Sequence, residues 1–195
     1  MRHALGLYAS NTDAVDSGDN LVTGTQFLGG STTVTPAAAI RWESGGGFRV
    51  TNCKFNGWDS GAWPIGIDCE IVAGGSTADI YIQNNSIENI SGTSIKLAQQ
   101  TVGSGSVELV QIQGNEFLGA ASVAHRLRSG LPTGIISGNV GDGNGTDTVG
   151  VKLESYEGPV LIDANMWTSR VVTPISGQPT FSLPASGSTW TNNTC

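Results

Sequence analysis

Asparagine recurs at matched positions in three segments of the chain, and this repeat restricts the fold more than any other feature. The segments are IYIQNNSI, VQIQGNEF and VLIDANMW, with Asn85, Asn115 and Asn165 as their marker residues. Apolar residues lie five and three positions before each marker and two positions after it. Because asparagine is disfavoured inside strands and common in turns, each marker is expected at a bend between two short strands.

The same template, with fewer matching residues, adds markers at Thr25, Cys53, Asn139 and Asn193. Successive markers at positions 25, 53, 85, 115, 139, 165 and 193 are 24 to 32 residues apart. A second apolar alternation follows most markers, so each repeat supplies at least two strands. Repeats of about 20 to 50 residues stack on one another because a single unit cannot bury its apolar face.

The composition of the repeat excludes the other repeat architectures. Helical repeats conflict with the period-2 alternation and with 28 glycines, and leucine-rich repeats need many more leucines. A propeller blade needs about 40 residues, more than these intervals supply. The sequence therefore predicts an all-β parallel β-solenoid (β-helix) of about six to seven coils, with equivalent residues about 4.8 Å apart along the axis.

The marker column has a structural explanation in such a fold. Stacked at one corner, each asparagine amide can donate to the next amide and accept from the previous one, which satisfies polar groups that face inward. We expect this structural ladder to contain six residues, and we assign it no catalytic role: Thr25, Cys53, Asn85, Asn115, Asn139 and Asn165.

The three asparagine segments resemble the right-handed parallel β-helix of pectate-lyase-like proteins, and within that group the β-helical domains of bacteriophage tailspikes and tail fibres. The resemblance covers about residues 20 to 195 and implies a right-handed winding. Residues 21–195 are then the β-helix, and residues 1–20 are an N-terminal cap or the end of an earlier coil. The same scaffold carries lyases, hydrolases, adhesins and structural virion parts, so it leaves the function open.

The charge of the chain limits its partners. The net charge is −7 and only 13% of the residues are charged, which disfavours nucleic acid or an anionic membrane. The chain has no run of 18 apolar residues and no signal-peptide core in residues 1–20. Cys53, Cys69 and Cys195 have no metal-binding spacing, and the first two are expected in the core. We predict no metal and no cofactor.

An inserted loop is the best candidate for a glycan-binding site. The segment NGWDSGAWPIGIDCE after Cys53 contains the predicted glycan-binding residues Trp58, Asp59, Trp63 and Asp68. Indole rings pack on the C–H faces of sugars, and carboxylates accept hydrogen bonds from sugar hydroxyls. The alternative is that one indole only covers the core.

The segment HRLRSGL, residues 125–131, is the most basic stretch. Alternation places Arg126 and Arg128 outward if Leu127 points inward, and we place His125 with them, without a catalytic role. These arginines are solvated, or they contact an acidic polysaccharide or a neighbouring subunit.

The sequence leaves open whether the protein is an enzyme, and it favours a protein without catalytic activity. Glycoside hydrolysis on this scaffold needs two carboxylates facing one cleft. Two sets can converge from adjacent coils, and neither identifies a catalytic residue: Glu43, Asp59, Asp68 and Glu70, and Glu88 with Glu116.

The resemblance favours a bacteriophage tail-fibre or tailspike-like structural protein of the virion tail that binds host-surface glycan. Its partners are expected to be the host polysaccharide and other tail or baseplate proteins. We expect a homotrimer, because the ends of a short solenoid need covering. One alternative is a polysaccharide depolymerase of the same fold. The other is an adhesin-like β-solenoid, extracellular or on a bacterial surface.

Overall fold

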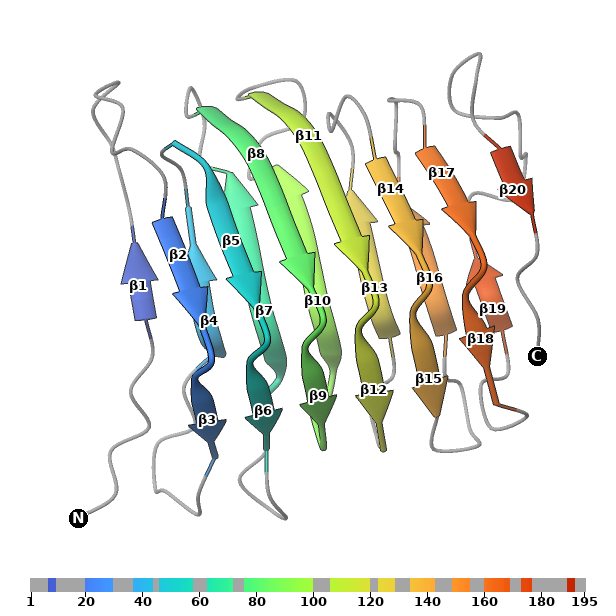
Figure 1. Ribbon diagram of the computed structural model, residues 1–195, viewed down its shortest axis with the longest axis horizontal. Coiled ribbons are helices and arrows are strands. Elements are labelled where there is room, and N and C mark those ends of the chain that lie inside the picture. Colours follow the sequence, from blue (N-terminus) through green and yellow to red (C-terminus); the bar gives the residue numbers. More distant parts are fainter. Residues whose placement is uncertain are drawn as a thin grey trace.

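The chain coils through three parallel β-sheets, shown in the computed structural model of Figure 1. The structure describes residues 7–9, 20–29, 37–43, 46–57, 63–71, 76–99, 106–119, 123–128, 134–142, 149–154, 160–168, 173–176 and 189–191. Within these ranges all regular structure is β-strand. The predicted all-β parallel β-solenoid is therefore confirmed.

Each coil contributes no more than one strand to each of the three sheets. Sheet A contains β1 (Leu7–Ala9), β4 (Ala38–Trp42), β7 (Ile65–Ile71), β10 (Thr93–Gln99), β13 (Val123–Arg128), β16 (Val149–Glu154) and β19 (Thr173–Ser176). Sheet B contains β2 (Asn20–Thr23), β5 (Phe48–Thr51), β8 (Ser76–Gln83), β11 (Ser106–Gln113), β14 (Gly134–Ser137), β17 (Val160–Asp163) and β20 (Thr189–Thr191). Sheet C contains β3 (Gln26–Leu28), β6 (Lys54–Asn56), β9 (Ser86–Glu88), β12 (Glu116–Leu118), β15 (Val140–Asp142) and β18 (Met166–Trp167).

Neighbouring strands of a sheet belong to successive coils and pair in parallel, as β8 does with β5 and β11. In Figure 1 the strands of sheet B lie in front and run down the page, while those of sheet A lie behind and run up. Successive coils advance to the right, so the winding is right-handed. Parallel crossover connections have this hand almost without exception.

The core is built from columns of like side chains, because parallel pairing stacks equivalent residues of successive coils. Ile40, Ile67 and Ile95 form such a column in sheet A, and each is fully buried. In sheet C, Phe27 stacks on Phe55 with 4.7 Å between ring centroids. Apolar residues at every second strand position thus form one continuous interior.

Cys53 and Cys69 belong to this core, as predicted, with exposed fractions of 3% and 0%. Burial raises the pKa of both thiols, well above the usual value for Cys69. Cys195 lies outside the described residues.

A row of buried asparagines marks the corner between sheets B and C. The amide of Asn85 donates to Asn115 Oδ1 at 2.9 Å, Asn115 donates to Asn139 at 3.0 Å, and Asn139 donates to Asn165 at 2.8 Å. Each accepting oxygen also receives the backbone N–H of the preceding asparagine. Each Nδ2 also donates to a backbone carbonyl, as Asn115 does to Ile82 at 2.9 Å. The amides therefore connect adjacent coils along the axis.

Toward the N-terminal coils, the corner positions are no longer occupied by asparagine. Cys53 joins it only through its backbone N–H, which donates to Asn85 Oδ1 at 2.9 Å. Thr25 takes the next corner position, but it is exposed and its hydroxyl donates to the carbonyl of Thr23 at 3.1 Å. The side-chain row runs from Asn85 to Asn165.

The residue before each corner adopts a left-handed backbone conformation, which the repeat template does not include. In five of these positions the residue is glycine or asparagine, the types that tolerate it: Gly24, Asn52, Asn84, Gly114 and Gly138. The exception is Ala164, with a φ of 50°. An alanine there is strained by contact of its Cβ with the following carbonyl.

Replacing Ala164 by glycine is therefore expected to stabilise the protein. Relief of the left-handed strain gains roughly 1 to 2 kcal/mol, and the greater freedom of glycine in the unfolded chain offsets about 0.4 to 1 kcal/mol. Denaturant unfolding should show a net gain. Ala98→Gly, at a buried strand position, is the control and should lower stability. A loss of stability in Ala164→Gly would contradict the strain.

Candidate functional site

Charged residues concentrate on sheet A, at positions that alternate with its core column. Arg41 of β4 and Lys96 of β10 pair in register with Asp68 of the intervening strand β7. Arg126 and Lys152 continue the same row on β13 and β16. With Arg128, five of the nine lysines and arginines of the chain lie on this one sheet.

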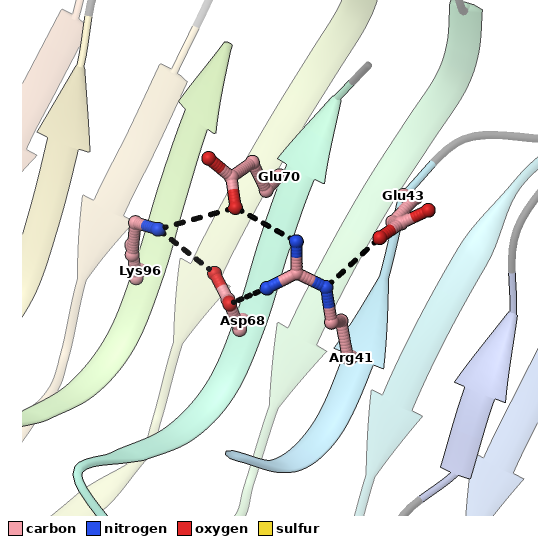
Figure 2. A network of polar contacts seen from close by, with 5 residues as sticks. All are labelled: Arg41, Glu43, Asp68, Glu70 and Lys96. Atoms are coloured by element: carbon pink, nitrogen blue, oxygen red, sulfur yellow. Dashed lines mark hydrogen bonds and ion pairs between the residues drawn. The ribbon is translucent and has the colours of Figure 1, made fainter. Parts of the chain in front are cut away.

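Five of the charged residues form a connected cluster, which we call the charge cluster: Arg41, Glu43, Asp68, Glu70 and Lys96. Figure 2 shows the guanidinium of Arg41 between three carboxylates, with distances of 2.8 Å to Asp68, 2.9 Å to Glu70 and 3.0 Å to Glu43. Lys96 Nζ approaches from the other side, 3.3 Å from Asp68 Oδ1 and 3.5 Å from Glu70 Oε2. The cluster thus spans three successive coils.

Asp68 is the most buried member of the charge cluster, with a side-chain exposure of 1%. Burial raises the pKa of this carboxyl, against the opposing charges of Lys96 and Arg41. For Arg41, burial alone lowers the pKa, but the hydrogen bond to Glu43 and the charges of Asp68 and Glu70 outweigh it, and the pKa is raised. The guanidinium is therefore a permanent cation in contact with a carboxyl whose pKa is raised by burial.

The charge cluster lacks the geometry of a glycosidase pair. Glu43, Asp68 and Glu70 do come together, as the sequence predicted, but Arg41 bridges them. A hydrolase needs two carboxyl groups that both reach the sugar. A side chain as buried as Asp68 cannot contact a polysaccharide in this conformation. This arrangement permits ion pairing and reactions between the members of the charge cluster.

The second carboxylate set lies on sheet C. Glu88 of β9 pairs in register with Leu118, and Glu116 of β12 pairs with Ser86, so the two are diagonal neighbours. Lys54 and Asn56 hold the Glu88 carboxylate, each at 3.0 Å. The Glu88 carboxylate therefore also pairs with residues of the neighbouring coil.

Two of the predicted glycan-binding residues are placed differently by the structure. Trp63 was expected on a surface loop, but it is 2% exposed and packs in the hydrophobic core. Its carbonyl accepts the backbone N–H of Ser91 at 3.0 Å, which fixes the segment ahead of β7 against the next coil. Asp68 is buried in the charge cluster. Trp58 and Asp59 lie outside the described residues.

His125 is also corrected. It was placed on the same face as Arg126, but adjacent strand residues alternate between faces. Its register partners are Ile95 and Val151, both fully buried members of the core column. His125 therefore takes a core position of the register, while Arg126 takes a position in the charged row.

Sequence reasoning missed Arg41 and Lys96 as partners of Asp68. The signal that finds them is the repeat interval, because each lies about one coil away from Asp68 in sequence and pairs with it in register. Neither stands near Asp68 in the chain, so a search within one segment overlooks both.

The fold and this cluster define a parallel β-solenoid with a charged sheet face. No protein-family model, curated protein or solved structure matches the chain. In the described part of the chain, no helix is long and apolar enough to cross a membrane. The same residues contain no group of His, Cys, Asp and Glu arranged to hold a metal ion.

Proposed function

We propose that this protein is a structural β-solenoid of the bacteriophage tail-fibre or tailspike kind, located in the virion tail, which binds host-surface glycan along sheet A. The observation that carries the proposal is the concentration of cations at register positions of one sheet in a chain whose net charge is −7. Cations at matching positions of the three consecutive strands β10, β13 and β16 suit a linear polymer lying along the axis.

The regular core and the asparagine row support a structural role. Amides linking successive coils leave few unpaired groups along the corner, so the solenoid presents its outer face on a rigid frame. A rigid face loses little conformational entropy when it binds a polymer. We propose a homotrimer attached to other tail proteins, with the trimer measurable by light scattering.

Glycan binding without cleavage is favoured over depolymerisation. Asp68 and Glu70 are both paired with Arg41, and Asp68 is buried. Neither is available to protonate a glycosidic oxygen or attack a sugar.

The test is binding to an array of bacterial capsular polysaccharides and lipopolysaccharide O-chains. The triple variant Arg126→Ala, Arg128→Ala, Lys152→Ala should weaken binding more than about tenfold, since each charge-assisted contact contributes about 1.5 to 3 kcal/mol. Lys54→Ala, which removes a 46% exposed cation on sheet C, is the matched control and should bind normally.

Two outcomes would overturn this function. The first is no binding to any array member by the folded chain, and the second is equal loss in the Lys54 control. Release of reducing ends from a bound polysaccharide would instead support the depolymerase. The variant Trp58→Ala with Asp59→Ala tests the inserted loop separately.

A further inference from the structure

Lys96 and Asp68 lie side by side on adjacent strands, and their ion pair differs from a surface pair because the Asp68 carboxyl group is buried. They are register partners between β10 and β7, and Lys96 Nζ lies 3.3 Å from Asp68 Oδ1. That oxygen is fully buried and accepts no hydrogen bond. The amine nitrogen is thus held against a buried carboxyl oxygen.

The other Asp68 oxygen is fixed by Arg41. Nη1 of Arg41 donates to Oδ2 at 2.8 Å, while Nη2 donates to Glu70 Oε2 at 2.9 Å. One guanidinium therefore orients both carboxyl groups, as Figure 2 shows. Glu70 Oε2 in turn lies 3.5 Å from Lys96 Nζ, close enough to exchange a proton with it after a small approach.

These four residues supply each part of an amide-forming reaction: a nucleophilic amine, a buried carboxyl, a proton carrier and a cation on the oxygen that becomes negative. We propose that Lys96 and Asp68 condense to an isopeptide bond between Nζ and Cγ, which covalently joins β10 to β7.

The reaction balances without a co-reactant. Glu70 accepts a proton from the Lys96 ammonium, and the resulting neutral amine attacks Cγ of Asp68. Negative charge develops on Oδ2, where the Arg41 guanidinium stabilises it. The C–Oδ1 bond then breaks, and Oδ1 leaves as water. Oδ1 carries away the proton of the neutral acid and one ammonium proton. Of the other two ammonium protons, one stays on the amide nitrogen and one stays on Glu70.

Burial of Asp68 assists this chemistry. A carboxylate is a poor electrophile, and burial raises the pKa of Asp68, which favours the neutral acid that an amine can attack. Exclusion of water from the Asp68 side chain, which is 1% exposed, also favours condensation over hydrolysis. The bond is independent of glycan binding, and it would hold two coils together when the solenoid is unfolded or pulled.

The intact mass of the purified full-length chain tests the proposal. The wild type should be lighter than its sequence mass by one water, and Lys96→Arg should have the full mass, because an arginine guanidinium is not a nucleophilic amine. Tryptic digestion should leave Lys96 uncleaved and yield one peptide, residues 55–126, that is closed into a loop between Asp68 and Lys96 and is lighter than its sequence mass by one water.

An internal control separates this bond from an ordinary ion pair. Lys54 and Glu88 lie 3.0 Å apart, but Lys54 is 46% exposed. Trypsin should cleave normally after Lys54 in the same digest. A water lost by succinimide formation at Asp142 and Gly143 would map to a different peptide and would overturn the proposal.

Glu70→Gln tests the proton carrier. After refolding from denaturant, this variant should form the bond about 100-fold more slowly than the wild type or slower still, the usual loss when a general base is removed. Circular dichroism should show the same β spectrum in both proteins. A folded wild-type chain that keeps its full mass and is cleaved after Lys96 would show that the pair is only ionic.

Discussion

Replacing Asn115 by leucine is expected to lower the free energy of unfolding by roughly 3 to 6 kcal/mol. The side-chain oxygen of Asn115 accepts the backbone N–H of Asn85 at 3.0 Å and its amide at 2.9 Å. The nitrogen donates to Asn139 at 3.0 Å and to the Ile82 carbonyl at 2.9 Å. Leucine makes none of these bonds. Asn85 Nδ2 and Asn139 Oδ1 each keep one backbone partner, but the Asn85 N–H and the Ile82 carbonyl lose the bond to residue 115, and each buried group left unpaired costs about 1 to 3 kcal/mol.

Gln113→Leu is the matched control for this substitution. Gln113 lies two residues earlier on the outer face of sheet B, where it accepts from Gln83 at 3.1 Å and donates to Ser137 at 2.9 Å. It is only half-buried, so water can replace these bonds, and the loss should stay within about 1 kcal/mol. Equal midpoints for both variants in urea unfolding would show that the asparagine row does not stabilise the coil.

The fold was predictable because the physical requirement at each corner repeats with the coil. A buried polar group must be hydrogen-bonded, and at Asn85, Asn115, Asn139 and Asn165 the partner is the equivalent residue of the next coil. The same residue type is therefore needed at a fixed structural position, and its spacing shows the length of each coil. Strand alternation then placed the core residues on one face.

The candidate site was less predictable because its members lie on different coils. Asp68 was selected for its proximity in sequence to tryptophans, whereas its partners Arg41 and Lys96 come from the neighbouring strands. Trp63 was misplaced because inserted segments do not follow the period of the repeat, so alternation says nothing of which side their residues face. The fold does not identify the glycan, because one scaffold supports many functions.

One core position also escaped the template. In the column Phe27, Phe55, Ile87, Phe117, Gly141 and Trp167, glycine stands where the other coils have a large side chain. The structure gives the reason, because a Cβ on Gly141 would overlap Cε3 and Cζ3 of the Trp167 ring. The indole, 1% exposed, fills the space of two residues. A pattern that scores each position separately cannot detect such an exchange of volume between coils.

This exchange predicts strong coupling between Gly141 and Trp167. Trp167→Ala leaves a cavity and should lower the free energy of unfolding by about 3 to 5 kcal/mol. Gly141→Leu overfills the core and should cost about 1 to 3 kcal/mol or more. The double variant returns a large side chain to coil position 141 and a small one to 167, so it should be more stable than Trp167→Ala alone.

A double-mutant cycle by urea unfolding measures this coupling. Val140→Leu is the control, because Val140 is the neighbouring residue on the outer face, is 44% exposed, and should change stability by less than about 0.5 kcal/mol. Additive losses in the double variant would mean that the two positions do not share one volume. A double variant that recovers stability would show that each coil of this solenoid is packed against the volume of the next, so that core substitutions must be judged along the column rather than residue by residue.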